Sequence, residues 1–350
     1  MAKANKKILV TGGAGYIGSH SVIELINAGY TPIVVDNLSN AHNTVFTGLN
    51  NILGFDVTHY NVNCNDHSIL SHIFKKEETI VGAIHFASHK SVGESVKLPL
   101  QYYKNNIQSL ITLIEVMMEN EVYNLVFSSS CAVYGDAEKL PVTEESRVVA
   151  PKSPYGNTKK ICEEILQDHA NSGTHFRSIA LRYFNPIGAH ESGEIGEYPL
   201  GAPANILPII TQAAAGVRKG FTVFGADYAT PDGTCVRDFI HITDLAKAHV
   251  KALELLENKE GQTYFDTFNI GTGKGYSILE LINAFERITG LRLNYTIGPR
   301  REGDIEKMYA GVDKATRTLG WKAEKTLDEA ISDAWRWQMK IVEMAKKNIF

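Results

Sequence analysis

A glycine-rich turn near the start of the chain places the strongest constraint on the fold. The apolar run Lys6–Val10 predicts a buried strand, and the periodic segment Tyr16–Ala28 predicts a helix. Gly12, Gly15 and Gly18 lie between these elements and at the start of the second. In a dinucleotide-binding turn, such glycines permit the tight bend, let backbone N–H groups approach a pyrophosphate, and let the helix pack closely on the strand. The helix N-terminus adds partial positive charge for the phosphates.

An acidic residue ends the next predicted strand. Pro32–Val35 is a short apolar run, and Asp36 follows it directly. A carboxylate at this point can accept hydrogen bonds from both ribose hydroxyls and would repel a 2′-phosphate, so NAD is favoured over NADP. The competing interpretation is a glycine turn without a ligand. The register of strand, helix and carboxylate argues against it.

Strands and helices alternate through the first half of the chain. Val81–Ala87 and Leu125–Ser129 are apolar runs of strand length, and long helices are predicted over Leu100–Asn120 and Tyr155–Asn171. This alternation implies parallel β–α–β crossovers, so we predict an α/β fold with a doubly wound, Rossmann-like parallel sheet. From Pro186 onward Gly and Pro become frequent and strands shorten, which predicts a smaller mixed α/β lobe for the substrate.

The 350 residues are enough for two lobes but too few for a multi-module protein. We assign residues 1–186 to the NAD-binding domain, with returning segments at about 238–272. Residues 187–237 and 273–350 are assigned to the substrate-binding lobe.

Composition excludes several classes of function. The net charge of −4 and the charged fraction of 21% give no broad basic surface for nucleic acid. No apolar run is long enough to cross a membrane, and the N-terminus lacks the apolar region of a signal peptide. The four cysteines and twelve histidines show no metal-binding spacing, so neither a metal site nor a disulfide framework is expected. These features predict a cytoplasmic protein.

A second motif supplies candidate chemistry. Tyr155 and Lys159 lie four residues apart on one predicted helical face, downstream of Ser130 at the end of an apolar strand. The carboxyl ends of parallel strands face the ligand crevice in a doubly wound sheet. A phenol with a pKa near 10 is a poor base at pH 7, but a lysine ammonium and a cationic nicotinamide would both favour the phenolate. We therefore expect Tyr155 to act as the base, with Ser130 hydrogen-bonded to the same oxygen.

The glycine spacing is similar to that of the extended short-chain dehydrogenase/reductase superfamily, and over nearly its full length the chain resembles the UDP-glucose 4-epimerases, also called UDP-galactose 4-epimerases. The segments that carry this resemblance are Thr11–His20, Asp36–Leu38, Ile84–Ala87, Ser91–Ser95, Phe127–Gly135, Ser153–Lys159, Arg182–Pro186, Arg237–His241 and Arg300–Asp304.

The resemblance implies reversible inversion at C4 of UDP-glucose and UDP-galactose, through a transient 4-keto sugar and tightly bound NAD, in galactose metabolism. The sugar must be held loosely enough to turn, while the smaller lobe holds UDP firmly. A homodimer is implied, with helices at about 100–120 and 155–171 forming the contact. No nucleic-acid or membrane partner is expected.

The resemblance also implies site residues. Cofactor positions are Gly12, Gly15, Tyr16, Ile17, Gly18, Asp36, Asn37, Asn40, Asn63, Cys64, Phe86, Ala87, Lys90, Asn105, Ser128, Tyr155, Lys159 and Tyr183. Substrate positions are Lys90, Ser130, Tyr155, Asn185, Asn205, Ile206, Thr222, Phe224, Arg237, Phe239, Arg301, Asp304 and Met308. Among these, Arg237 and Arg301 are expected on the diphosphate, Phe224 near uracil, and Asp304 on the uridine ribose.

Four positions depart from the commonest family pattern. Asn63 replaces an Asp at the adenine, Ala132 replaces a frequent Thr, and Phe239 replaces a frequent Tyr. Met308 occupies the position that resembles the gate of the sugar pocket, where a bulky aromatic excludes N-acetylated sugars and a small residue admits them. Methionine is intermediate and adaptable, so some activity on UDP-N-acetylglucosamine and UDP-N-acetylgalactosamine is expected.

Two rival functions stay open. A nucleotide-sugar 4,6-dehydratase or decarboxylase shares the fold, but dehydratases need acidic residues where this chain has Cys131 and Ala132. A non-catalytic NAD-sensing protein would be expected to lose Tyr155 or Lys159, and both are present.

Overall fold

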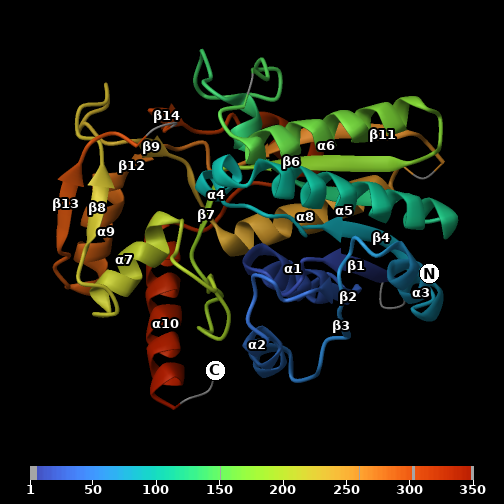
Figure 1. Ribbon diagram of the computed structural model, residues 1–350, viewed down its shortest axis with the longest axis horizontal. Coiled ribbons are helices and arrows are strands. Elements are labelled where there is room, and N and C mark those ends of the chain that lie inside the picture. Colours follow the sequence, from blue (N-terminus) through green and yellow to red (C-terminus); the bar gives the residue numbers. More distant parts are fainter. Residues whose placement is uncertain (1–5, 150, 260, 302–303, 348–350) are drawn as a thin grey trace.

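The computed structural model describes residues 6–149, 151–259, 261–301 and 304–347, and its centre is a seven-stranded sheet (Figure 1). The strands follow the order β11–β6–β5–β4–β1–β2–β3, and every neighbouring pair is parallel. Their bounds are β1 (Lys7–Thr11), β2 (Thr31–Asp36), β3 (His59–Asn61), β4 (Ile80–His85), β5 (Asn124–Ser130), β6 (Arg177–Tyr183) and β11 (Tyr264–Ile270). The doubly wound parallel sheet predicted from the sequence is confirmed.

Helices cover both faces of this sheet, as parallel strands require. One face carries α1 (Tyr16–Asn27) and α8 (Ile242–Glu257), which pack side by side. The other face carries α3 (His67–Lys76), α5 (Pro99–Glu119) and α6 (Pro154–Asn171). The two long helices predicted from periodicity are therefore confirmed to within one residue at each end.

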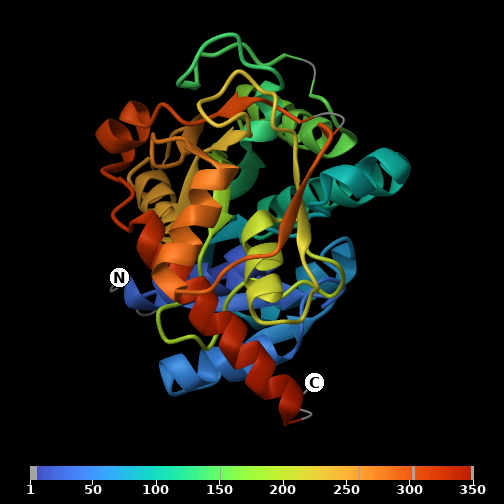
Figure 2. The same cartoon turned by 90° about the vertical axis from the view of Figure 1, so that its left-hand side faces the viewer.

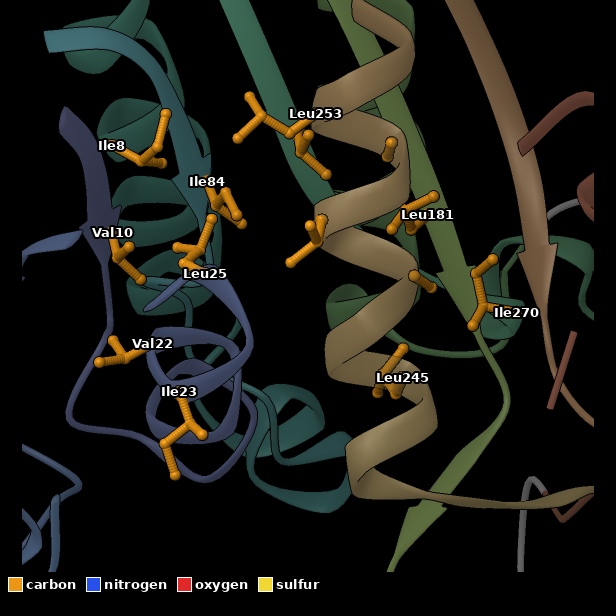
Figure 3. Close-up of a cluster of buried hydrophobic side chains, with 14 of the residues drawn as sticks. Ile8, Val10, Val22, Ile23, Leu25, Ile84, Leu181, Leu245, Leu253 and Ile270 are labelled. Atoms are coloured by element: carbon orange, nitrogen blue, oxygen red, sulfur yellow. The ribbon is translucent and has the colours of Figure 1, made fainter. Parts of the chain in front are cut away.

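Successive side chains along each strand pack into two separate hydrophobic cores, one on each face of the sheet. Ile8 and Val10 point towards α1 and α8, whereas Leu9 points towards α3 and α5. Figure 3 shows the first of these cores, in which Leu25 of α1 and Leu253 of α8 face the sheet. All five side chains are fully buried, and each such burial stabilises the fold by roughly 1.5–3 kcal/mol.

The second lobe lies at one end of the sheet and is built from three small sheets and three helices (Figure 2). The sheets pair β7 with β10, β8 with β13, and β9 with both β12 and β14. Strand bounds are β7 (Asn185–Ile187), β8 (Phe221–Phe224), β9 (Val236–Arg237), β10 (Phe239–His241), β12 (Tyr276–Ser277), β13 (Tyr295–Gly298) and β14 (Lys307–Met308). The helices are α7 (Ile206–Ala214), α9 (Ile278–Thr289) and α10 (Leu327–Lys346).

The remaining helices are α2 (Thr44–Leu53) and α4 (Val92–Lys97), with single turns at Cys131–Tyr134 and Ala315–Leu319. β11 falls within the segment 238–272 and returns the chain to the main sheet. The exact division at 186, 237 and 272 stays a prediction. The first five and last three residues of the assigned ranges, and Glu302 and Gly303, lie outside the described residues.

The topology fixes where a ligand can bind. Successive strands run from β1 to β3 in one direction across the sheet and from β4 to β6 in the other, so the order reverses between β1 and β4. In open α/β sheets the ligand crevice lies outside the carboxyl ends of the strands at this reversal. Thr11 and His85 end these two strands, which brings the glycine turn and the residues after β4 to one edge.

Candidate functional site

The glycine turn leaves β1 in a conformation that only glycine allows. Gly12 has φ of +70°, and a Cβ there would lie 2.7 Å from the backbone nitrogen of Ala87. A Cβ on Gly18 would lie 2.2 Å from the carbonyl oxygen of Gly12, so α1 could not approach the turn. Gly15 has more room, since its Cβ would meet only that carbonyl oxygen at 3.2 Å. Two of the three glycines are thus required by packing, and the third leaves an uncovered backbone at the helix N-terminus.

The first helical residues anchor the turn to the second lobe. The Tyr16 hydroxyl donates to the carbonyl of Gly188 at 2.8 Å, and Ile17 packs against the core beneath α1. Burial, with a smaller contribution from Glu197, raises the pKa of Tyr16 well above its ordinary value. The phenol is therefore neutral beside the predicted pyrophosphate position.

Asp36 lies at the carboxyl end of β2, beside the glycine turn. Its two carboxylate oxygens accept from the backbone nitrogens of Ala14 at 3.0 Å and Leu38 at 2.8 Å. Burial raises the pKa of Asp36, while these two N–H donors act against that rise. The carboxylate thus braces the turn as well as lying where the ribose was predicted.

The predicted adenine side is formed by the loops after β2 and β3. The Asn37 side chain accepts from the backbone of Ser39, and Asn40 is exposed nearby. The Asn63 carbonyl oxygen accepts from the backbone nitrogen of Asn65 at 3.0 Å. Burial, followed by the charge of Asp36, raises the pKa of Cys64 to about 12, so that residue is a neutral thiol.

The catalytic candidates meet at the carboxyl end of β5. α6 carries Tyr155 and Lys159, and the Lys159 Nζ lies 5.9 Å from the Tyr155 ring centroid. The ammonium donates to the carbonyl of Ser128 at 2.7 Å and lies 4.9 Å from the Phe127 ring centroid. The Ser130 hydroxyl accepts from the Ala132 nitrogen at 3.2 Å, which starts the turn after β5. The structure therefore brings Ser130, Tyr155 and Lys159 together.

The electrostatics of this group differ from expectation. Burial raises the pKa of Tyr155 to about 12, and the hydrogen bond with Ser130 only partly offsets that rise. Burial also lowers the pKa of Lys159 to about 8, against the opposing charges of Cys162 and Glu163. The expected lowering of the tyrosine pKa is thus wrong for the chain alone, because desolvation of the phenolate exceeds the local stabilisation and Lys159 donates to a carbonyl. A second cation at this edge, in addition to the Lys159 ammonium, would favour the phenolate and lower the pKa of Tyr155.

A buried polar network behind Lys159 was not predicted. Glu163 accepts from Arg182 Nε at 3.0 Å and Nη2 at 2.6 Å, and it also accepts from the Ser129 hydroxyl. Arg182 Nη1 donates to the Tyr134 hydroxyl at 2.9 Å. The signal was available, because Glu163 lies one helical turn beyond Lys159 on the same face.

The predicted nicotinamide side lies around the ends of β4 and β6. Tyr183 ends β6, and its hydroxyl is hydrogen-bonded to His249 Nε2. His249 Nδ1 donates to the carbonyl of Leu245 at 2.8 Å, so Nε2 is the acceptor and Tyr183 the donor. Burial lowers the pKa of His249 to about 3, which keeps this imidazole neutral. The Phe86 ring packs on His249 with centroids 4.7 Å apart.

Three further cofactor candidates lie after β4 and on α5. Ala87 follows β4 and contacts Gly12 closely. The Asn105 side chain, on α5, accepts from Asn65 at 3.3 Å and donates to Asn106 at 3.1 Å. Lys90 lies between these elements and forms an ion pair with Glu197 at 3.2 Å.

The predicted diphosphate and uridine residues converge in the second lobe. Arg237 and Arg301 both approach Asp304 Oδ1, with nitrogen–oxygen distances of 3.7 and 2.7 Å. The Arg301 guanidinium lies 5.9 Å from the Phe224 ring centroid, and that ring is 44% exposed. Thr222, on the same strand as Phe224, pairs with a neighbouring hydroxyl across to β13. Two guanidinium groups beside an exposed aromatic face suit a nucleoside diphosphate.

The other substrate candidates differ in accessibility. Asn185 begins β7, and Asn205 and Ile206 lie at the start of α7. Phe239 is 3% exposed and packs in the core of the second lobe. Met308 is 2% exposed and packs with the Tyr134 and Phe184 side chains, so it forms part of a wall beside Cys131.

Two cavities flank the second lobe. The larger, of about 840 Å³, lies between α2 and α10 and is lined by polar residues, none of which belongs to the predicted site. The smaller, of about 20 Å³, is lined by Tyr16, Glu197 and α7. Across the described residues, no three or more His, Cys, Asp or Glu side chains are grouped so as to hold a metal ion.

None of the helices in the described ranges has the length and apolar character needed to cross a membrane.

Comparison with known proteins agrees with the fold and with the NAD site predicted at the glycine turn. The model of the NAD dependent epimerase/dehydratase family matches residues 8–271. The UDP-glucose 4-epimerase of Drosophila melanogaster is 48% identical over 95% of this chain and 96% of its own length. That of Bacillus subtilis (strain 168) is 47% identical over 95% of this chain and 96% of its own.

Solved structures agree with the sequence relatives. The UDP-glucose 4-epimerase of Stenotrophomonas maltophila, with bound NAD and formylated UDP-arabinopyranose, is 44% identical, has a TM-score of 0.93, and is matched over 97% of this chain and 99% of its own. The enzyme of Bifidobacterium longum, in complex with NAD+ and UDP, is 44% identical with a TM-score of 0.91 over 96% and 98%. With a family match over most of its length and relatives of this identity, the chain belongs to the NAD-dependent epimerase/dehydratase family and, within it, to the UDP-glucose 4-epimerases.

Proposed function

We propose that this chain interconverts UDP-glucose and UDP-galactose by inverting C4 of the hexose, with NAD held in the glycine turn. The observation that carries the proposal is the meeting of Tyr155 and Lys159, at the end of β5, on the sheet edge that also holds Gly12. Family membership adds to this support, since the relatives named above are UDP-glucose 4-epimerases. A role in galactose metabolism in the cytoplasm follows from the same reaction.

The residues at the turn fit the cofactor. A Cβ would fill the space beside Gly12 and Gly18, and Asp36 presents a carboxylate at the end of β2, which would repel a 2′-phosphate. When bound, NAD would supply reversible two-electron oxidation of the sugar carbon and one positive charge near the predicted base. That positive charge would offset the rise in the pKa of Tyr155, because an adjacent cation favours the phenolate.

The chain's own residues would move the proton and hold the substrate. Tyr155 takes the proton of the 4-hydroxyl, and Ser130 beside it favours the phenolate by lowering the pKa of Tyr155. Lys159 stays fixed on the Ser128 carbonyl and contributes its charge. Arg237 and the residues around it hold the diphosphate, which leaves the 4-keto sugar free to turn before it is reduced from the other face.

The gate residue supports a side activity. Met308 is buried in a wall of apolar side chains, and its thioether can change rotamer more easily than an aromatic ring can move. We propose weak activity on UDP-N-acetylglucosamine and UDP-N-acetylgalactosamine. Comparable kcat/KM for both sugar pairs would show that Met308 is no barrier, and the absence of any N-acetylhexosamine activity would remove this claim.

A dehydratase has less support. Burial raises the pKa of Cys131 to about 12, and Ala132 has no ionisable group, so neither supplies an acid–base pair across C5 and C6.

The test is incubation of the purified protein with UDP-galactose and no added NAD. Formation of UDP-glucose without net NADH supports the epimerase. A stable keto sugar would indicate a 4,6-dehydratase, and no product would indicate an NAD-sensing protein; either result would overturn the proposal.

A further inference from the structure

Glu197 is a partly buried acidic residue on the loop between β7 and α7. Its Oε1 accepts from the Lys90 ammonium at 3.2 Å and from the Asn205 side-chain nitrogen at 2.7 Å. The Glu197 side chain is 10% exposed. Lys90 follows β4 of the main sheet, whereas Asn205 precedes α7 of the second lobe. One carboxylate oxygen therefore joins two candidate ligand-binding side chains that come from the two parts of the molecule.

The backbone on both sides of Glu197 is held by Trp337 of α10. A Cβ on Gly196 would lie 2.4 Å from the indole, so only glycine lets the loop approach so closely. Trp337 Nε1 donates to the Glu197 carbonyl at 3.1 Å. The Tyr198 ring meets the same indole edge to face and stacks on His42 at 3.9 Å between centroids. The loop thus holds the carboxylate in a fixed position.

The Asn205 side chain does not cap α7 but reaches this carboxylate instead. It occupies the N-cap position of α7, where asparagine side chains commonly accept from the first turn of the helix. Here the side chain forms no capping hydrogen bond and points to Glu197 instead. A missing cap destabilises a helix, so the arrangement favours orientation of the amide over stability of α7.

We propose that Glu197 is a positioning residue for the UDP-hexose, acting through Asn205. The amide of Asn205 has two N–H donors, and Glu197 accepts from one of them. The other donor stays available for ligand while its direction is fixed in advance. This inference rests on the proposed function for the identity of the ligand.

A purely structural tie between the lobes would behave differently from a positioning residue. A contact that only joins the two lobes stabilises the protein whether or not ligand is present. The effect of removing it would not depend on which residue stands at position 205. A positioning residue changes ligand affinity, and its effect disappears once the side chain that it orients is removed.

The experiment measures UDP-glucose binding by calorimetry in the NAD-loaded Tyr155→Phe protein, in which turnover does not complicate the titration. Adding Glu197→Gln is expected to weaken binding about tenfold, the loss typical of a charge-assisted hydrogen bond. Adding Glu197→Gln to an Asn205→Ala background is expected to change the affinity less than about twofold. The matched control is Glu194→Gln, on the same loop, whose carboxylate pairs with Lys340 at 2.8 Å on the surface of α10.

Several results would overturn the proposal. These are unchanged affinity in Glu197→Gln, an equal loss in the Asn205→Ala background, or an equal loss in Glu194→Gln. If Glu197→Gln does not fold, Glu197→Asp replaces it, because the shorter side chain keeps the charge but cannot reach both partners and should weaken binding similarly. Failure here is distinct from failure of the proposed function, which would appear as inactivity of the unmodified protein on UDP-galactose.

Discussion

At the scale of single residues, burial keeps Tyr155 a neutral phenol despite the nearby Lys159 ammonium. Its pKa of about 12 reflects burial, and only Ser130 lowers it within the chain. Tyr155→Phe removes the proton acceptor and little volume, so kcat should fall about 10³-fold while UDP affinity stays within about twofold. A coupled assay and calorimetry with UDP measure the two quantities. Turnover at the unmodified rate would refute the assignment of the base.

Glu163 is the second residue whose effect can be anticipated. It forms a two-pronged ion pair with Arg182, and both side chains are less than one-tenth exposed. Glu163→Gln leaves a buried guanidinium without its charge partner, which should destabilise the protein by about 3–5 kcal/mol in urea unfolding. Because the Glu163 charge raises the pKa of Lys159, its loss should also move the Lys159 titration to lower pH.

The pH dependence of kcat separates the two roles of Glu163. A shift of the profile to lower pH supports electrostatic coupling to Lys159. Lower stability with an unchanged profile would limit Glu163 to structure. Lys160→Gln, one residue after Lys159 but paired with Glu164 on the surface, is the control and should alter neither quantity.

At the scale of elements, α1 can pack against the turn after β1 only because residue 18 is glycine and has no Cβ. Gly18→Ala would put a Cβ 2.2 Å from a backbone oxygen, so the helix must move away and its N-terminal N–H groups with it. We expect NAD affinity to fall by at least about 100-fold and stability by about 1–3 kcal/mol. Gly93→Ala, on α4 with open space around it, should change neither adversely. Cofactor content after purification and a thermal melt measure both; full NAD content in Gly18→Ala would contradict this account.

Periodicity predicted elements such as α5 and α6 because each must bury one apolar face. The spacing of apolar residues within the helix itself shows which face that is. The spacing of Tyr155 and Lys159 on α6 was predictable for the same reason. The contacts of Glu163 with Arg182 and of Glu197 with Lys90 were not, because each joins two separate elements that only the fold brings together. The raised pKa of Tyr155 was also missed, since the degree of desolvation depends on packing around the whole site.

At the scale of the whole molecule, an apolar surface lies over α4 and the start of α5. Val96 is 62% exposed and Leu100 is 81% exposed, and α5 packs beside α6. Exposed apolar side chains of this size are commonly covered by a partner, which agrees with the homodimer predicted from the sequence. Leu100→Glu should raise the dimer dissociation constant about tenfold or more in sedimentation, whereas Leu291→Glu, in the second lobe, should not. A monomeric mass for the unmodified protein at micromolar concentration would rule out the dimer.

Stability of the whole molecule should also depend on pH through buried histidines. Burial lowers the pKa of His20, His85 and His249 to about 3, whereas an unfolded histidine titrates near 6.5. Below pH 6.5 the unfolded chain binds protons that the folded chain does not, so this stability is present above pH 6.5 and is lost as the pH falls towards 3. Each of the three histidines contributes a slope of about 1.4 kcal/mol per pH unit to the free energy of unfolding. Together they contribute about 4 kcal/mol per pH unit.

His85 is the member of this set that can be replaced most cleanly, because its ring lies between the hydroxyls of Thr11 and Ser109, where an amide can also hydrogen-bond. His85→Gln should reduce the slope of unfolding free energy against pH by about 1.4 kcal/mol per pH unit, measured by urea unfolding between pH 6 and 4 with NAD kept saturating. His67→Gln, whose side chain is 43% exposed, serves as the control and should leave the slope unchanged. An unaltered slope in His85→Gln would mean that this imidazole is protonated within the fold, and that acid unfolding has another origin.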